Sequence, residues 1–112
     1  MYIAAFIYRP GSLDAEFRRL TASIDAVAAS LPGFVGMESW RSTDGLMFNA
    51  SYYWRDEATL RAFAAHPKHL DAKRRFRKWY DGYHVVVLKV ERAYGDGSFQ
   101  HLVPDSRRER ID

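Results

Sequence analysis

The chain has no cysteine, few prolines and no long apolar run, and each absence narrows what the protein can be. Without cysteine it has neither disulfides nor thiolate metal sites, which fits a reducing compartment. No apolar stretch approaches the roughly 20 residues of a membrane-spanning helix. The N-terminal segment MYIAAFIYRP lacks a basic region and is too short for the apolar core of a signal peptide. We therefore expect a cytoplasmic protein without a membrane partner.

Apolar and aromatic residues, by contrast, are abundant. The length of 112 residues predicts one domain. Hydrophobic residues make up 47% of the chain and aromatic residues 15%, which is more than one small core requires. Self-association is the simplest use of this excess, so we expect a homodimer.

The net charge of +3 is concentrated in two basic segments. One lies around residues 68–78 and the other around residues 107–110. A solvated helix face and a loose chain end account for both segments, and nucleic-acid binding is the alternative. We expect no nucleic-acid partner.

Periodicity and turn residues predict the order β-α-β-β-α-β. The first helix is expected to begin at Ser12 as N-cap and to end before Pro32-Gly33. A second helical segment breaks at Pro67, restarts there, and runs to about Asp81, with Gly82 as its stop. Strands are expected over residues 2–9, 34–42, 46–54 and 83–94, with a hairpin turn at residues 43–45. Residues 1–94 then form an α+β, ferredoxin-like domain with an antiparallel sheet, and residues 95–112 form a loose tail or an arm that packs on a neighbour.

Alternation within the strands makes both faces of this sheet apolar. In the segment 46–54, Tyr52 and Trp54 share one face, while Asn49 and Tyr53 share the other. Both helices are expected on one face only. The other face must therefore meet a partner sheet, line a pocket or bind a flat ligand.

The stretch from Tyr52-Tyr53-Trp54 through His66-Pro67-x-His69 to Trp79-Tyr80 and Tyr83 resembles the antibiotic biosynthesis monooxygenase domain family. The resemblance covers residues 1–94. It implies a homodimeric α+β barrel, in which two ferredoxin-like sheets pack face to face, with one apolar pocket per subunit between sheet and helices. Members of that family oxidise quinol-like polyketides with dioxygen and no cofactor, degrade haem, or oxidise small signalling quinones, and many have no known activity.

Three positions separate this chain from the haem-degrading branch. That branch uses an asparagine on the first strand, which has none here. Its tryptophan falls on Phe63, and its iron-ligating histidine falls on Lys73. The resemblance therefore disfavours haem as a cofactor, with His66 and His69 as the alternative iron ligands. Two histidines without a third ligand are also a weak metal signal, and we predict no metal site.

The cofactor-free, quinol-oxidising branch matches better. Its tryptophan at the end of the third strand corresponds to Trp54, whereas its asparagine four residues earlier corresponds to Ala50. The resemblance therefore implies a cofactor-independent monooxygenase that acts on a small aromatic or quinol-like molecule with dioxygen.

Such chemistry needs an electron-rich substrate, a group that favours its anion, and a dry pocket. We expect Trp54 to donate its indole N–H to the substrate, and His69 or His66 to act as proton acceptor. The structural alternatives are core packing for Trp54 and for His69, which lies in an apolar helical stripe, and helix capping for His66. The aromatic residues expected to bind the substrate are Tyr52, Trp40, Phe63, Trp79 and Tyr83.

Two other function classes compete with the oxygenase. A non-catalytic dimer that binds a small aromatic molecule would use the same pocket. RNA-recognition domains share the order of elements, but their third strand carries a basic-Gly-aromatic pattern that LMFNASYYW at 46–54 lacks.

Overall fold

The structure, a computed structural model, describes residues 1–107; residues 108–112, which include the predicted basic chain end at Arg108 and Arg110, lie outside the described residues. Within the described part, four strands and three α-helices confirm the ferredoxin-like α+β order, with the second helical unit divided in two. The elements are β1 (Tyr2–Pro10), α1 (Ala15–Ser30), β2 (Phe34–Arg41), β3 (Phe48–Trp54), α2 (Glu57–Ala64), α3 (Pro67–Arg74), a 3-10 turn (Phe76–Lys78) and β4 (Tyr80–Lys89).

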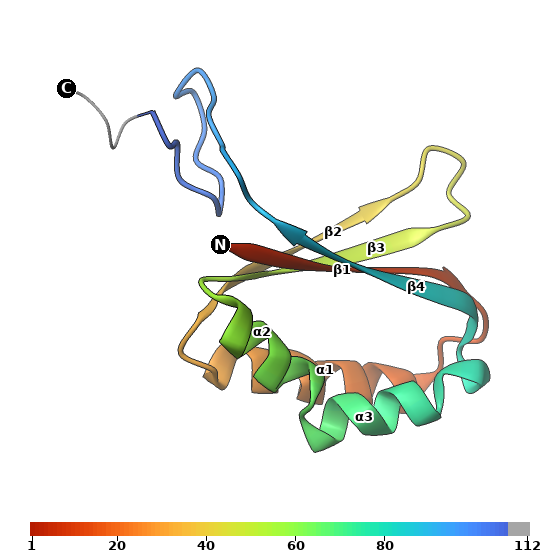
Figure 1. The fold of residues 1–112 in the computed structure, drawn as a ribbon. Coiled ribbons are helices and arrows are strands. Elements are labelled where there is room, and N and C mark those ends of the chain that lie inside the picture. Colours follow the sequence, from red (N-terminus) through yellow and green to blue (C-terminus); the bar gives the residue numbers. More distant parts are fainter. Residues whose placement is uncertain (108–112) are drawn as a thin grey trace.

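The strands form an antiparallel sheet in the order β2-β3-β1-β4, and the helices lie together on one of its sides (Figure 1). Residues paired across neighbouring strands point to the same face. The alternation predicted for β3, with Tyr52 on the helix-facing side and Tyr53 on the other, agrees with this register. Two neighbouring rows on the helix-facing side are Ala4, Tyr52 and Val87, and Phe6, Ala50 and Val85.

Helix α1 begins two residues later than predicted. Its N-cap is Asp14 and not Ser12. The Asp14 side chain accepts hydrogen bonds from the backbone N–H of Phe17 at 2.9 Å and from the indole N–H of Trp79 at 3.0 Å. The second of these bonds comes from a distant part of the chain, which sequence periodicity does not show.

The predicted helix from Pro67 to Asp81 is wrong in its second half. Helix α3 ends at Arg74, and Tyr80 already belongs to β4, where it pairs with Pro10. The carbonyl of Trp79 accepts a hydrogen bond of 2.6 Å from the N–H of Gly11, so the end of β1 draws this segment into the sheet. Gly82, expected as a helix stop, lies instead in an irregular part of β4 with φ of +135°, a conformation that favours glycine.

A buried core joins β3 to α1 and α2. It consists of Ala28, Trp54, Leu60 and Phe63. Trp54 is fully buried, with its ring 5.2 Å from that of Phe34 and 5.0 Å from that of Phe63. This cluster fills one end of the space between sheet and helices and leaves the other end open.

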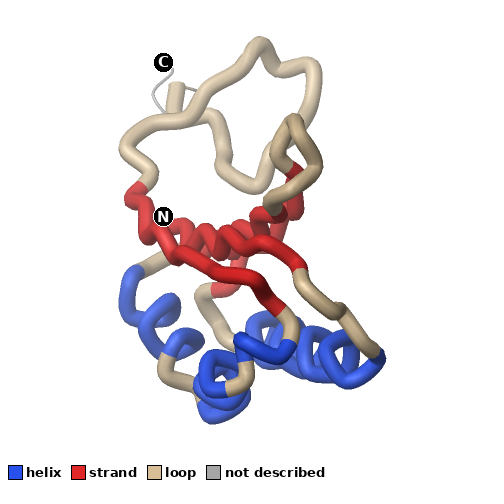
Figure 2. Tube along the Cα trace, turned by 90° about the vertical axis from the view of Figure 1, so that its right-hand side faces the viewer, coloured by secondary structure: helices blue, strands red, loops and turns tan. Residues whose placement is uncertain are grey.

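The tail folds back over the side of the sheet that has no helices (Figure 2). His101 Nε2 lies 2.8 Å from a carboxylate oxygen of Glu38, and the other oxygen of Glu38 accepts a 2.5 Å hydrogen bond from Tyr53. Leu102 lies against Gly36, where a Cβ atom would come within 2.7 Å of it. The described part of the tail therefore packs on β2 and β3 of its own chain.

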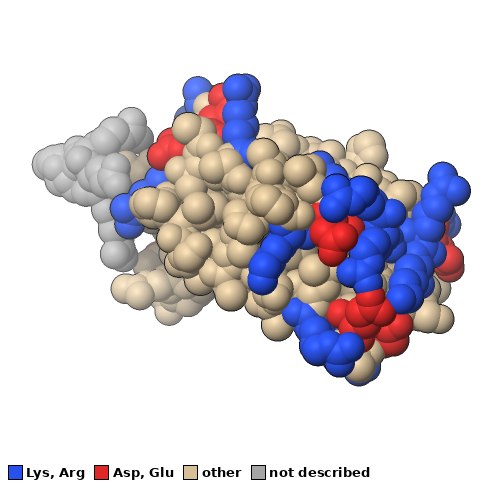
Figure 3. Space-filling model, turned by 90° about the horizontal axis from the view of Figure 1, so that it is seen from below, with Lys and Arg blue, Asp and Glu red and all other residues tan. Residues whose placement is uncertain are grey.

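Basic side chains gather at one end of the helical side, with acidic side chains among them (Figure 3). Glu16 pairs with Arg75 and Lys78, and Asp71 pairs with Arg74 and Arg75. Several of the charges in the predicted basic run are thus balanced by acidic neighbours. No helix in residues 1–107 combines the length and apolarity needed to span a bilayer.

Candidate functional site: an aromatic cavity between sheet and helices

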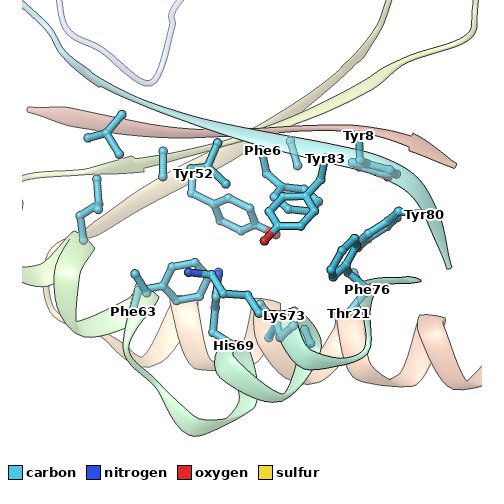
Figure 4. Close-up of a pocket in the computed structure, with 18 of the residues that line it drawn as sticks. Phe6, Tyr8, Thr21, Tyr52, Phe63, His69, Lys73, Phe76, Tyr80 and Tyr83 are labelled. Carbon is cyan, nitrogen blue, oxygen red and sulfur yellow. The ribbon is translucent and has the colours of Figure 1, made fainter. Parts of the chain in front are cut away.

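A cavity of about 200 Å³ lies between the sheet and the helices, beyond the buried core (Figure 4). Strands β1, β3 and β4 supply its roof, and α1, α2 and α3 supply its floor. Most of its lining is apolar or aromatic, as an aromatic ligand requires. The ring-bearing residues that line it are Phe6, Tyr8, Phe17, Tyr52, Phe63, His69, Phe76, Tyr80 and Tyr83.

His69 stands on α3 at the cavity wall, with its ring edge-on to Phe63 at 4.8 Å. Burial lowers the pKa of His69 to about 4, and the charges of Lys73 and His66 add to this effect. The imidazole is therefore neutral at pH 7. Its Nδ1 is buried without a hydrogen-bond partner, which leaves Nε2 as the ring nitrogen that can meet a bound molecule.

A buried donor without an acceptor costs more than a buried lone pair without a donor. The neutral ring of His69 is therefore most stable with its proton on Nε2, because the unpaired Nδ1 then carries only a lone pair. In this tautomer His69 presents an N–H donor to the cavity.

Tyr52 forms a polar wall of the cavity between β3 and α1. Its hydroxyl donates a 3.0 Å hydrogen bond to Asp25 on α1. Burial and the neighbouring Asp25 carboxylate raise the pKa of Tyr52 far above its usual value, and burial raises the pKa of Asp25. The Tyr52 hydroxyl therefore stays protonated and is committed to Asp25.

Two further tyrosines, Tyr8 and Tyr80, meet at the opposite end of the cavity with ring centroids 4.7 Å apart. Burial raises the pKa of both, and in Tyr80 the neighbouring Tyr8 adds to the effect. Both are phenols at neutral pH and are available as hydrogen-bond donors. Neither residue was among those predicted to bind the substrate, since Tyr80 was expected in a helix and Tyr8 at the end of a strand. The alternation Ala4, Phe6, Tyr8 was the signal that pointed to this wall.

Of the residues predicted to bind the substrate, the structure brings Tyr52, Phe63 and Tyr83 to the cavity. Trp79 lies outside its lining, almost fully buried, with its N–H bonded to Asp14. Trp40 points to the opposite face of the sheet, in register with Asn49, and is 63% exposed.

Of the three predicted catalytic residues, only His69 lines the cavity. Trp54 lies behind Phe63 in the core, and its indole N–H is buried without a partner. His66 is the N-cap of α3, where its Nδ1 accepts a hydrogen bond from the backbone N–H of Lys68 at 3.2 Å. His66 thus lies at the helix-capping position that was expected as the alternative to a catalytic role.

The residues at this site do not fit haem. Among the described residues, no group of three or more His, Asp or Glu side chains could hold a metal ion. His69 is the one histidine in the described lining, and the space around it, about 200 Å³ between aromatic side chains, is small for a tetrapyrrole.

The arrangement can therefore hold a small, flat, aromatic molecule out of water. Rings from β1, β3 and β4 can stack on it, and Nε2–H of His69 can donate to one of its oxygen atoms. A single donor in an apolar cavity acts strongly, because little water competes with it.

Residues 8–91 match the family described as Monooxygenase af470-like. Uncharacterized protein YqjZ of Bacillus subtilis is 40% identical over 80 residues, which span 70% of this chain and 69% of that protein.

Several solved structures share the fold, and two of them serve as examples. One is a mutant of SnoaB, a cofactor-independent oxygenase from Streptomyces nogalater, with 22% identity, a TM-score of 0.67, and coverage of 82% of this chain and 94% of that one. The other is Rv0793 from Mycobacterium tuberculosis, with 15% identity, a TM-score of 0.67, and coverage of 85% and 100%. At these identities the likeness shows the fold alone. The match over residues 8–91 goes further, and the chain belongs to the Monooxygenase af470-like family.

Proposed function

We propose that the protein is a cofactor-independent monooxygenase that oxidises a small aromatic or quinol-like molecule with dioxygen. The observation that carries this proposal is the aromatic cavity with the His69 ring, neutral at pH 7, in its wall. Membership of a monooxygenase family and the fold shared with SnoaB, described as a cofactor-independent oxygenase, support it.

The chemistry follows from the substrate. Ionisation of a phenol or anthrol hydroxyl gives an electron-rich anion, and its proton passes to solvent. The anion transfers one electron to dioxygen, and the resulting carbon radical and superoxide combine into a new C–O bond. The resulting peroxide anion takes up one proton from solvent, and the hydroperoxide then loses water together with the hydrogen on the same carbon, which leaves a carbonyl. One oxygen atom of dioxygen enters the product, the other leaves as water, and the substrate supplies all of the electrons.

In this scheme the protein binds, orients and shields the substrate. His69 donates Nε2–H to the substrate oxygen and stabilises its anion, in place of the proton-acceptor role that the sequence suggested. Trp54 supports the cavity from behind Phe63, because its N–H does not reach the lining. Tyr52, Phe63 and Tyr83 form the binding walls.

The test is oxygen consumption by the metal-free protein with a panel of hydroquinones and anthrols, beside a haem titration. We expect saturable oxygen uptake without any added cofactor. His69→Leu should lower kcat/KM by about 100-fold, the usual loss for one oxyanion donor. Lys68→Leu, on the same helix but outside the cavity lining, is the matched control and should leave it unchanged. Tight binding of the same compounds without oxygen uptake would refute the oxygenase and favour the non-catalytic binding protein.

We further infer a homodimer formed through the sheet face that carries no helices. Besides the segment that the tail covers, this face presents an apolar surface to solvent, including Leu88 at 44% and Trp40 at 63% exposure. Burial of such a patch in a partner is the ordinary explanation for it. Leu88→Asp should convert a dimer to a monomer in light scattering, and a wild-type protein that is monomeric at micromolar concentration would refute this arrangement.

A further inference from the structure

One charged side chain opens onto the cavity. Lys73 lies on α3 one turn after His69, and it is the one charged residue in the described lining (Figure 4). Because the other lining side chains are apolar, phenolic or neutral at pH 7, the lining itself carries a single positive charge, and the Asp25 carboxylate behind it is bonded to Tyr52.

The neighbours of Lys73 leave its charge uncompensated. The nearby acidic residues are already engaged, since Asp71 pairs with Arg74 and Arg75, and Glu16 pairs with Arg75 and Lys78. Within residues 1–107, Lys73 takes part in no ion pair and in no hydrogen bond through its side chain. An unpaired ammonium at the mouth of an apolar cavity attracts an anion more strongly than one on an open surface.

His69 adds a neutral donor beside this charge. An oxygen anion placed between Nζ of Lys73 and Nε2–H of His69 would receive one charge-assisted and one neutral hydrogen bond, while its aromatic ring stacked in the cavity. A neutral aromatic molecule of the same shape would fill the same space and leave Lys73 without a partner.

We propose that Lys73 makes this cavity selective for aromatic anions, whose ring lies among the cavity aromatics and whose phenolate, enolate or carboxylate oxygen lies against Lys73 and His69. This inference depends on the proposed function in one respect: the aromatic anion is the reactive form of the proposed substrate. Binding selectivity follows from the cavity and its charge whether or not turnover occurs.

A pair of fluorescent probes tests the charge alone. 1-Anilinonaphthalene-8-sulfonate and N-phenyl-1-naphthylamine share one ring system, and only the first carries a sulfonate. We expect the wild-type protein to bind the anionic probe about ten-fold more tightly, the gain of one favourable charged hydrogen bond. Lys73→Met should abolish this preference by weakening the anionic probe alone, and Lys73→Arg should retain it.

Two controls locate the effect. Lys68→Met removes a charge from the same helix at a position outside the cavity lining, where Lys68 bonds to Ser23, and should keep the preference. Ala72→Phe fills the cavity and should weaken both probes. Far-ultraviolet circular dichroism shows independently of the probes whether each Lys73 variant is folded, and Lys73→Gln replaces Lys73→Met if the latter fails to fold.

The inference is overturned if Lys73→Met leaves the preference intact, if it weakens both probes equally in a folded protein, or if Ala72→Phe spares the anionic probe. Oxygen uptake with an anthrol as substrate is measured separately, so that a failure of this inference can be told apart from a failure of the proposed function. A charge preference without oxygen uptake refutes the oxygenase alone, and uptake without a charge preference refutes the role of Lys73 alone.

Discussion

Acidification from pH 7 to pH 5 should destabilise the fold through His69. Burial holds the pKa of this ring at about 4 in the folded protein, whereas a histidine in the unfolded chain titrates near about 6.5. Between pH 6.5 and pH 4, His69 therefore binds a proton in the unfolded state but not in the folded state. The stability from the neutral, buried ring is complete above pH 6.5 and is lost as the pH falls toward 4.

The size of this effect follows from the two pKa values. With a pKa of about 4 in the folded state and about 6.5 in the unfolded state, His69 would lower the free energy of unfolding by about 2 kcal/mol at pH 5 and by about 3 kcal/mol at pH 4. His69 is half-buried at the cavity wall, and solvent that reaches the ring screens part of its charge. We therefore expect a loss of about 1–2 kcal/mol between pH 7 and pH 5 from this residue.

The assay compares urea unfolding of the wild type and of His69→Gln at half-unit steps from pH 7 to pH 5. Carboxylates titrate alike in both proteins, so the difference between the two curves isolates His69. The curve of His69→Gln should be flatter by about 1–2 kcal/mol over this range. Lys68→Gln, on the same helix but outside the cavity lining, is the matched control and should run parallel to the wild type.

Parallel curves for the wild type and His69→Gln would refute the reasoning. They would mean that His69 takes up its proton in the folded protein at the same pH as in the unfolded chain, so that water reaches the ring. The water-shielded donor on which the site's proposed chemistry depends would then be lost.

Four further substitutions probe the groups around the cavity and the contacts of the tail. Trp54→Phe removes a buried, unpaired N–H, which stabilises the fold by about 1–3 kcal/mol and offsets the cost of the lost ring volume. The free energy of unfolding in urea should therefore change by about 1 kcal/mol or less, and turnover should be retained. Trp79→Phe should destabilise the fold more than Trp54→Phe, because the indole N–H of Trp79 donates a hydrogen bond to Asp14. Equal losses of unfolding free energy in the two variants would contradict this difference between the two N–H groups. Tyr52→Phe leaves the partly buried Asp25 without its donor and should cost about 1–2 kcal/mol in the same assay at pH 7, whereas a neutral result would show that water replaces the hydroxyl. Glu38→Gln weakens the contacts that hold the tail, so limited trypsin digestion should cleave at Arg107 faster than in wild type, and an unchanged rate would show that the tail is held elsewhere.

The sheet could be predicted from the sequence because its signals are local. Alternation in the strands places Tyr52 on the cavity side without any knowledge of its partners, and Gly45, with φ of +75°, supplies the predicted hairpin turn. The helical segment after Pro67 could not be predicted as well. Its aromatic stripe through Tyr80 fits a helix, but pairing of Tyr80 with Pro10 depends on a strand seventy residues away.

The candidate site was predictable in part for a similar reason. Tyr52 and Tyr83 follow from strand alternation, and His69 from its place in an apolar helical stripe. Trp54 shares the face of Tyr52, yet it lies one pair further along the strand, where Phe63 closes the core in front of it. Alternation gives the face of a residue but not its position along the cavity, which the packing of α2 decides.

The most direct test of the oxygenase is turnover of an anthrol by the metal-free protein under ¹⁸O₂, with mass spectrometry of the product. We predict one ¹⁸O atom in the new carbonyl, with the same yield in the presence of a strong metal chelator and a clear loss in His69→Leu. A product without the label, or oxidation that His69→Leu does not slow, would contradict oxygenation at this cavity.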